Sequence, residues 1–171
     1  MSNKIWGFTG ETKIHLGTTL KRIRASVGFE LKCGVVIGKG ELGGWIEKES
    51  NLSGSAWVSG DACVHGNAMV CGDAMVCDDA EVSGNAKVSG DAEVSGNAKV
   101  KSSEDYCVYK NTWSSFRWFT YTRSNKMWSV GCFHGTSDEL ITKAYKDSKK
   151  SGKCYEAIVK AQEAIEKVME E

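Results

Sequence analysis

The sequence predicts a mainly β protein built around a short parallel β-solenoid, and three regularities between residues 56 and 100 predict it. A valine recurs at every sixth position, and an alanine stands two positions before each of these valines. A glycine followed by aspartate or asparagine separates most of the Ala-X-Val segments. The valines of this series are Val58, Val64, Val70, Val76, Val82, Val88, Val94 and Val100.

Each repeat has the properties of a short strand followed by a corner. An alanine and a valine two positions apart lie on the same side of an extended chain, so we expect both to point inward and the residue between them to point outward. Glycine and its Asx neighbour then supply the turn. A strand this short cannot bury its valine alone, whereas stacked coils can. A helix is disfavoured because a six-residue period drifts around a helix of about 3.6 residues per turn.

The flanking segments predict units that protect the open ends of this stack. Residues 1–43 mix short apolar runs with glycine turns, which indicates an N-terminal cap of two or three short strands before the repeat region, 44–103. Residues 104–135 are rich in aromatic side chains that alternate in strand fashion around a Ser-Asn-Lys turn, which indicates a small antiparallel sheet. Residues 136–171 predict two helices, so the C-terminal unit is of the α+β type.

The two helices are predicted from a start signal, a break and a periodic stripe. The capping-box sequence Thr-Ser-Asp-Glu at residues 136–139 predicts the start of the first helix. Ser151 and Gly152 predict the break between the two helices. Apolar residues three or four positions apart predict the buried sides of the helices. They are Leu140, Ile141, Ala144 and Tyr145 in the first helix, and Cys154, Ile158, Ala161, Ile165 and Val168 in the second.

The V-S-G-[DN]-A hexads resemble those of the left-handed parallel β-helix family, the hexapeptide-repeat fold found in many acyltransferases. The resemblance implies a left-handed winding with three hexads in each triangular coil. Two further blocks, LGGWIEKESNLS at residues 42–53 and GCFHGT at residues 131–136, resemble those of proteins encoded in phages and prophages. This second resemblance implies a small accessory or host-interfering protein of a phage.

Charge and cysteine content restrict the classes of partner. The 171 residues carry 22 basic and 22 acidic side chains, so we expect that extended nucleic acid is not the main partner. Residues 41–100 are acidic, with three basic and ten acidic side chains, and they lie between basic flanks. Seven cysteines without paired spacing predict reduced thiols and a cytoplasmic location in the bacterial host. Because no apolar run approaches membrane length, we expect no membrane partner.

The repeat region lacks the residues that chemistry on this fold usually uses, so we expect no catalytic residue, no metal site and no cofactor. The histidines are His15, His65 and His134, and only His65 lies in the repeats. A metal site built from histidines needs several of them on neighbouring coils. His65 directly follows an inward valine, which predicts a surface position rather than a general base.

The aromatic segment 113–128 is the predicted ligand-binding region. Alternation along a strand places four of its residues on one face, and these are Arg117, Phe119, Tyr121 and Arg123. Arginines between aromatic side chains suit phosphate pairing and base stacking, so this face could contact an anionic nucleotide or a host protein. The alternative is that the face packs against the solenoid or the helices. Trp118 or Trp128 is predicted to be structural instead.

We also expect the chain to self-associate. A trimer is favoured, and a dimer is the alternative. The predicted interface is the outward set Trp57, Met69 and Met75, which is too apolar to face solvent in a row. The alternative is that the N-terminal segment folds over these side chains.

These features favour a non-enzymatic binding protein of the phage type that acts by occupying a host molecule, such as a defence component or its nucleotide signal. One alternative is a transferase that uses acyl-coenzyme A, which the fold alone suggests. A second alternative is a homo-oligomeric structural scaffold.

Overall fold

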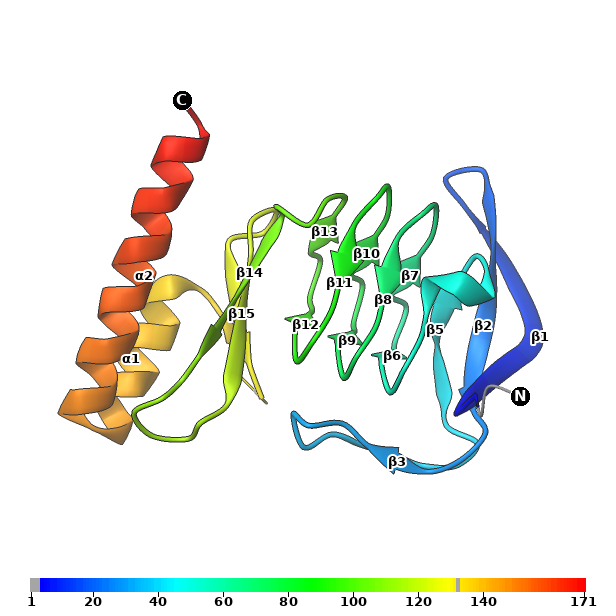
Figure 1. Ribbon diagram of the computed structural model, residues 1–171, viewed down its shortest axis with the longest axis horizontal. Coiled ribbons are helices and arrows are strands. Elements are labelled where there is room, and N and C mark those ends of the chain that lie inside the picture. Colours follow the sequence, from blue (N-terminus) through cyan, green and yellow to red (C-terminus); the bar gives the residue numbers. More distant parts are fainter. Residues whose placement is uncertain (1–3, 132) are drawn as a thin grey trace.

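A computed structural model describes residues 4–131 and 133–171. The molecule is elongated, with the solenoid at its centre, an N-terminal β-hairpin at one end, and a small sheet backed by two helices at the other (Figure 1). This arrangement confirms the predicted fold class, a mainly β chain with about three parallel stacked coils and a C-terminal α+β unit.

The repeats form eight two-residue strands that stack in parallel. Each pairs with the equivalent strand eighteen residues away, as Val64 pairs with Val82, and Val82 with Val100. The pairing divides the coils into three faces, whose sheets contain β7-β10-β13, β8-β11 and β6-β9-β12. The strands are β6 (Trp57–Val58), β7 (Cys63–Val64), β8 (Met69–Val70), β9 (Met75–Val76), β10 (Glu81–Val82), β11 (Lys87–Val88), β12 (Glu93–Val94) and β13 (Lys99–Val100).

The solenoid core consists of the predicted alanine and valine columns, all of which are buried. Glycine corners keep a positive φ, for example 64° at Gly60 and 67° at Gly66. Asp78 stands at the glycine position of its repeat and adopts the same conformation, with a φ of 61°. The Asp78 carboxylate also accepts a hydrogen bond from the backbone N–H of Gly96 in the next coil. Aspartate therefore replaces glycine here without interrupting the stack.

The N-terminal segment extends one face of the solenoid. Strands β1 (Trp6–His15) and β2 (Thr18–Ala25) form an antiparallel hairpin, and β2 pairs with β5 (Leu42–Ile46), which pairs in parallel with β7. The described part of the predicted cap, residues 4–43, contains four complete strands and the start of β5, where the sequence predicted two or three. After β5, a short 3-10 helix, η1 (Glu49–Asn51), leads into the first coil.

A second hairpin from the same segment covers another face. Strands β3 (Phe29–Glu30) and β4 (Val36–Ile37) pair antiparallel, and their hairpin runs along the solenoid beside β6, β9 and β12 (Figure 1). Leu31 and Ile37 are buried in the solenoid core, and the Phe29 ring packs edge-on against Trp57 with centroids 5.6 Å apart. The N-terminal segment therefore folds over outward apolar side chains of the solenoid, which was the alternative to self-association.

The C-terminal sheet closes the far end of the solenoid, as predicted. Its antiparallel strands are β14 (Tyr106–Lys110), β15 (Trp118–Thr122), β16 (Met127–Val130) and β17 (Phe133–Gly135). Side chains of this unit accept hydrogen bonds from backbone N–H groups of the last coil. Thr120 Oγ1 lies 2.9 Å from the nitrogen of Glu93, and Ser124 Oγ lies 2.7 Å from that of Lys99. In the middle of the stack, such backbone N–H groups donate to carbonyl oxygens of the next coil. At the end of the stack no further coil follows, and these side chains take the place of the carbonyl oxygens.

Two helices cover the other side of this sheet. Helix α1 (Ser137–Asp147) begins at the predicted capping box, with Thr136 as N-cap and Glu139 as its partner. The predicted break at Ser151 and Gly152 is wrong, because α2 (Lys149–Met169) already begins after Ser148, whose side chain caps it. Gly152 is instead a packing residue, since a Cβ there would lie 2.3 Å from the Tyr145 ring. The glycine permits close approach of the helices and does not end one.

The buried stripe of α2 differs from the predicted one by about one position. Tyr155, Val159 and Gln162 are buried, whereas Ile165 and Val168 of the predicted stripe are exposed. The helix extends beyond the sheet, so its last turns have less to pack against (Figure 1). No helix within residues 4–131 and 133–171 is long and apolar enough to span a membrane.

Candidate functional site

Two of the four residues predicted to bind a ligand are buried within the chain. Phe119 and Tyr121 point toward the helices, where they form a buried cluster with Trp128, Leu140 and others. Burial raises the pKa of Tyr121 to about 12, so its hydroxyl stays protonated near neutral pH. Strand alternation was predicted correctly, but the sequence could not show that the helices cover this face. Of the two tryptophans considered for a structural role, Trp128 is fully buried and Trp118 is 41% exposed.

The two arginines at the ends of β15 differ in their surroundings. The Arg123 guanidinium donates to Glu166 of α2, with Nε and Oε1 3.0 Å apart, so its charge is already paired within the chain. Arg117 precedes the strand and is exposed, and no ion pair among the described residues includes it. Of the four predicted contact residues, Arg117 is therefore the one available to a ligand.

The oligomer interface was predicted on the premise that three apolar side chains are exposed to solvent. The structure shows that two of the three are not. Trp57 is fully buried within the chain, and Met75 is partly buried against the same core. The β3–β4 hairpin covers both, since it supplies Phe29 and Leu31 to this core. Met69 lies on another face and remains 39% exposed. Self-association stays a prediction, but an exposed row of three apolar side chains no longer supports it.

A cleft of about 380 Å³ lies where the β3–β4 hairpin, the last coil and the C-terminal sheet meet. The hairpin contributes Lys32 and Cys33, and the solenoid contributes Asp91 and Glu93. The loop before β15 contributes residues 115–118, and the turn after β16 contributes Gly131. A volume of this size is within the range of small-molecule sites in proteins.

The cleft contains charged groups of both signs. Lys32 Nζ lies 2.7 Å from the Asp73 carboxylate and 3.9 Å from that of Asp91. The buried Oδ1 of Asp91 has no hydrogen-bond partner. Burial, together with the charge of Asp78, raises the pKa of Glu93 to about 7. A carboxyl group that is partly protonated near neutral pH can both donate and accept hydrogen bonds.

Two aromatic side chains are exposed at the cleft. Phe116 is 65% exposed and has a φ of 56°, which is uncommon for a bulky residue. Trp118 is 41% exposed, and the Lys110 ammonium lies 5.2 Å from the centroid of its ring. The loop that carries them is fastened at its base by buried Asn111, which bonds to Ser114 and to Tyr155 of α2. An exposed phenylalanine on a strained backbone at a cleft is typical of a binding loop.

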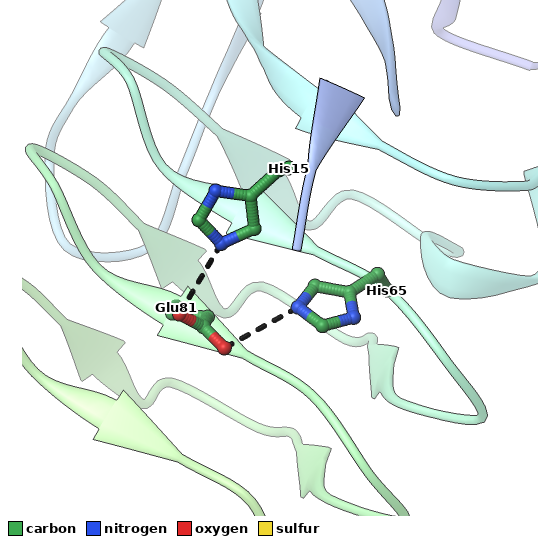
Figure 2. Close-up of side chains that lie close together, drawn as sticks. All are labelled: His15, His65 and Glu81. Carbon is green, nitrogen blue, oxygen red and sulfur yellow. Dashed lines mark hydrogen bonds and ion pairs between the residues drawn. The ribbon is translucent and has the colours of Figure 1, made fainter. Parts of the chain in front are cut away.

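A second polar cluster lies on a different face of the solenoid, where the β1–β2 hairpin joins the sheet that contains β7 and β10. His15 ends β1, His65 follows β7, and Glu81 lies on β10, and their side chains point toward one another (Figure 2). His15 Nε2 is 3.4 Å from Glu81 Oε2, and His65 Nε2 is 3.3 Å from Glu81 Oε1. Burial alone would raise the pKa of Glu81, but hydrogen bonds to the two histidines lower it below its usual value.

Sequence reasoning missed this cluster because it counted only histidines inside the repeats. The partner of His65 comes from residue 15, fifty positions earlier, and only pairing of the hairpin with the solenoid brings the two together. The third histidine, His134, bonds to Ser95 and Ser129 at the junction with the C-terminal sheet.

Comparison of the chain with protein-family models and with curated protein sequences found no match.

Proposed function

We propose that this chain is a binding protein without catalytic activity, and that its cleft takes a small anionic ligand carrying a flat ring, of the nucleotide class. One observation carries the proposal: the unpaired Arg117 guanidinium and the exposed rings of Phe116 and Trp118 line the same cleft. A guanidinium recognises phosphate oxygens with parallel N–H donors, and exposed rings stack on bases.

The carboxyl groups of the cleft suit the other end of such a ligand. Asp91 Oδ1 is buried without a hydrogen-bond partner, although Lys32 Nζ lies 3.9 Å away, and Glu93 also lines the cleft. An exocyclic amine or a ring N–H group of a base would supply the hydrogen-bond donor that Asp91 Oδ1 lacks. The Arg117 side would then hold the phosphate, and the Asp91 side the base.

The cleft cysteine supports binding rather than covalent chemistry. Burial raises the pKa of the Cys33 thiol, which keeps it in the protonated and weakly nucleophilic form. In the setting that the phage resemblance implies, the protein would act by occupying a host defence component or its nucleotide signal. The acyl-coenzyme A transferase and the oligomeric scaffold are the alternatives.

The proposal is tested by calorimetric titration of the untagged protein with ATP, GTP and a cyclic dinucleotide, with inorganic phosphate as the comparison. We expect one of the nucleotides to bind with one-to-one stoichiometry and phosphate to bind much more weakly, because phosphate lacks the ring. Arg117→Ala should weaken binding roughly 10- to 100-fold, the effect of losing a charge-assisted hydrogen bond.

Arg123→Ala is the matched control, since it removes the same side chain from the other end of β15. We expect unchanged affinity and a somewhat lower melting temperature, because Arg123 pairs with Glu166. Binding that survives Arg117→Ala, or that Arg123→Ala weakens equally, would contradict the proposed site. Absence of binding by all three nucleotides would contradict the ligand class. Release of free coenzyme A from acetyl-coenzyme A would favour the transferase alternative.

A further inference from the structure

The cluster of His15, His65 and Glu81 has the geometry of a metal site. Each residue offers one ligand atom, and the three atoms lie within 4.8 Å of one another. Both imidazoles present Nε2 to the carboxylate, and the rings are inclined at 66° with centroids 5.7 Å apart (Figure 2). Three side chains from three separate segments of the chain therefore converge on one point.

The spacing of the ligand atoms fits a shared ion better than it fits strong hydrogen bonds. Nitrogen–oxygen separations of 3.4 and 3.3 Å exceed the usual hydrogen-bond distance of about 2.9 Å. Two ligand atoms bound to Zn²⁺ at about 2.05 Å, at a tetrahedral angle, lie about 3.3 Å apart. The two nitrogen–oxygen pairs would therefore need little movement to accommodate the ion.

The surroundings also suit a cation. Glu81 is the one carboxyl group among the three side chains, so it supplies the acidic ligand of the cluster. It is held on a rigid coil, where β10 pairs on both sides with β7 and β13. The His65 and Glu81 side chains are 14% and 13% exposed, whereas that of His15 is 33% exposed, so solvent reaches the cluster from the hairpin side. A water molecule could complete the coordination there.

We propose that His15, His65 and Glu81 bind one divalent transition-metal ion, for which Zn²⁺ is the natural probe. Two imidazole nitrogens with one carboxylate oxygen are ligands that Zn²⁺ accepts, whereas Ca²⁺ and Mg²⁺ prefer oxygen ligands throughout. The ion would fasten the end of the β1–β2 hairpin to the coils at β7 and β10. This site is separate from the cleft and does not depend on the proposed ligand.

The test is titration of the untagged, metal-free full chain with ZnCl₂, followed by calorimetry and by metal analysis after gel filtration. We expect one equivalent of Zn²⁺ per chain and a higher melting temperature in its presence, because an ion that binds only the folded state stabilises it. His15→Ala and His65→Ala should each abolish stoichiometric binding and the zinc-dependent rise in melting temperature. Cobalt substitution should give the intense visible absorption of a tetrahedral site.

His134→Ala is the matched control, because it removes the remaining histidine from a different place and should leave one equivalent bound. Circular dichroism of each variant shows whether it is folded, and Glu81→Gln provides an independent variant that keeps both histidines. The proposal is overturned if the wild-type chain binds no stoichiometric Zn²⁺. It is also overturned if folded His15→Ala and Glu81→Gln bind as much Zn²⁺ as the wild type, since cysteine thiols would then be the ligands.

Discussion

Glu81 and Glu93 occupy the same position of the repeat, yet the segments around them give their carboxyl groups opposite properties. Glu81 lies beneath the β1–β2 hairpin, where two histidines lower its pKa. Glu93 lies near the β3–β4 hairpin, where burial and Asp78 raise its pKa to about 7. On the third face, Met69 and Lys87 at this position stay exposed. The repeat positions the outward side chain, and the covering segment determines its chemistry.

The largest expected change in stability distinguishes a substitution at an inward position from one at an outward position of the same repeat. Val88→Asp should unfold the chain, because a charge buried in the middle of the stack has no partner and costs several kcal/mol, which is comparable to the whole stability of a domain. Lys87→Asp places the same residue one position earlier, on the exposed side, and should change stability by less than about 0.5 kcal/mol. Circular dichroism and urea denaturation measure both. Equal tolerance of the two substitutions would show that the inward face is assigned wrongly.

The next largest change in stability distinguishes the solenoid face that the β3–β4 hairpin covers from the face that is exposed. Trp57→Ala should lower the free energy of unfolding by about 3–5 kcal/mol, because it leaves a cavity beneath Phe29 and the β3–β4 hairpin. Met69→Ala, at the same repeat position on the exposed face, should cost less than about 1 kcal/mol. Urea denaturation of the two variants measures this difference. A similar loss in both would mean that the hairpin does not cover Trp57 in solution.

The third effect concerns the two glutamates directly. The pKa of Glu93 is raised from 4.5 to about 7, so the folded state binds its proton more tightly than the unfolded state does. Stability therefore falls as the pH rises from about 4.5 to 7, by roughly 3 kcal/mol in total. Glu93→Gln should remove this dependence, so that the variant is equally stable at pH 4.5 and more stable than the wild type above pH 7. Free energies of unfolding across this range provide the measurement.

Glu81→Gln should have the opposite sign. Because the pKa of Glu81 is lowered in the folded state, its carboxylate contributes stability above its ordinary pKa, and that stability is lost as the pH falls through the acid range. The variant should be less stable than the wild type at neutral pH by about 1 kcal/mol, the contribution of one ordinary hydrogen bond. Effects of the same sign for both variants would contradict the comparison between the two sites.

The repeat could be predicted from the sequence because each of its positions is specified by the residue that occupies it and by the neighbours of that residue. Each valine, such as Val82, specifies its own inward position, and each glycine specifies its own corner, so the stack follows from the period alone. The same holds for the start of α1, where Thr136 and Glu139 satisfy each other within one turn. The prediction that Arg117 contacts a ligand also came from local information, its place in an aromatic segment, and it stays a prediction.

The errors arose where one residue type has two structural uses. Gly152 suggested a helix break, but the glycine serves close contact with Tyr145, and Ser148 provides the boundary. Phe119 and Tyr121 suggested a stacking surface, but they form the core between sheet and helices. Aromatic side chains suit both purposes, and only knowledge of which face the helices cover distinguishes them.

By itself, the sequence determined the coil, its inward columns and the order of the units along the chain, because a six-residue period and a capping box act over neighbouring residues. The tertiary structure alone decided which outward residues meet. His15 reaches Glu81 across 66 positions, and Lys32 reaches Asp91 across the length of a hairpin and two coils. Such contacts depend on where a hairpin docks, which is set by the sum of many packing contacts and by no single local signal.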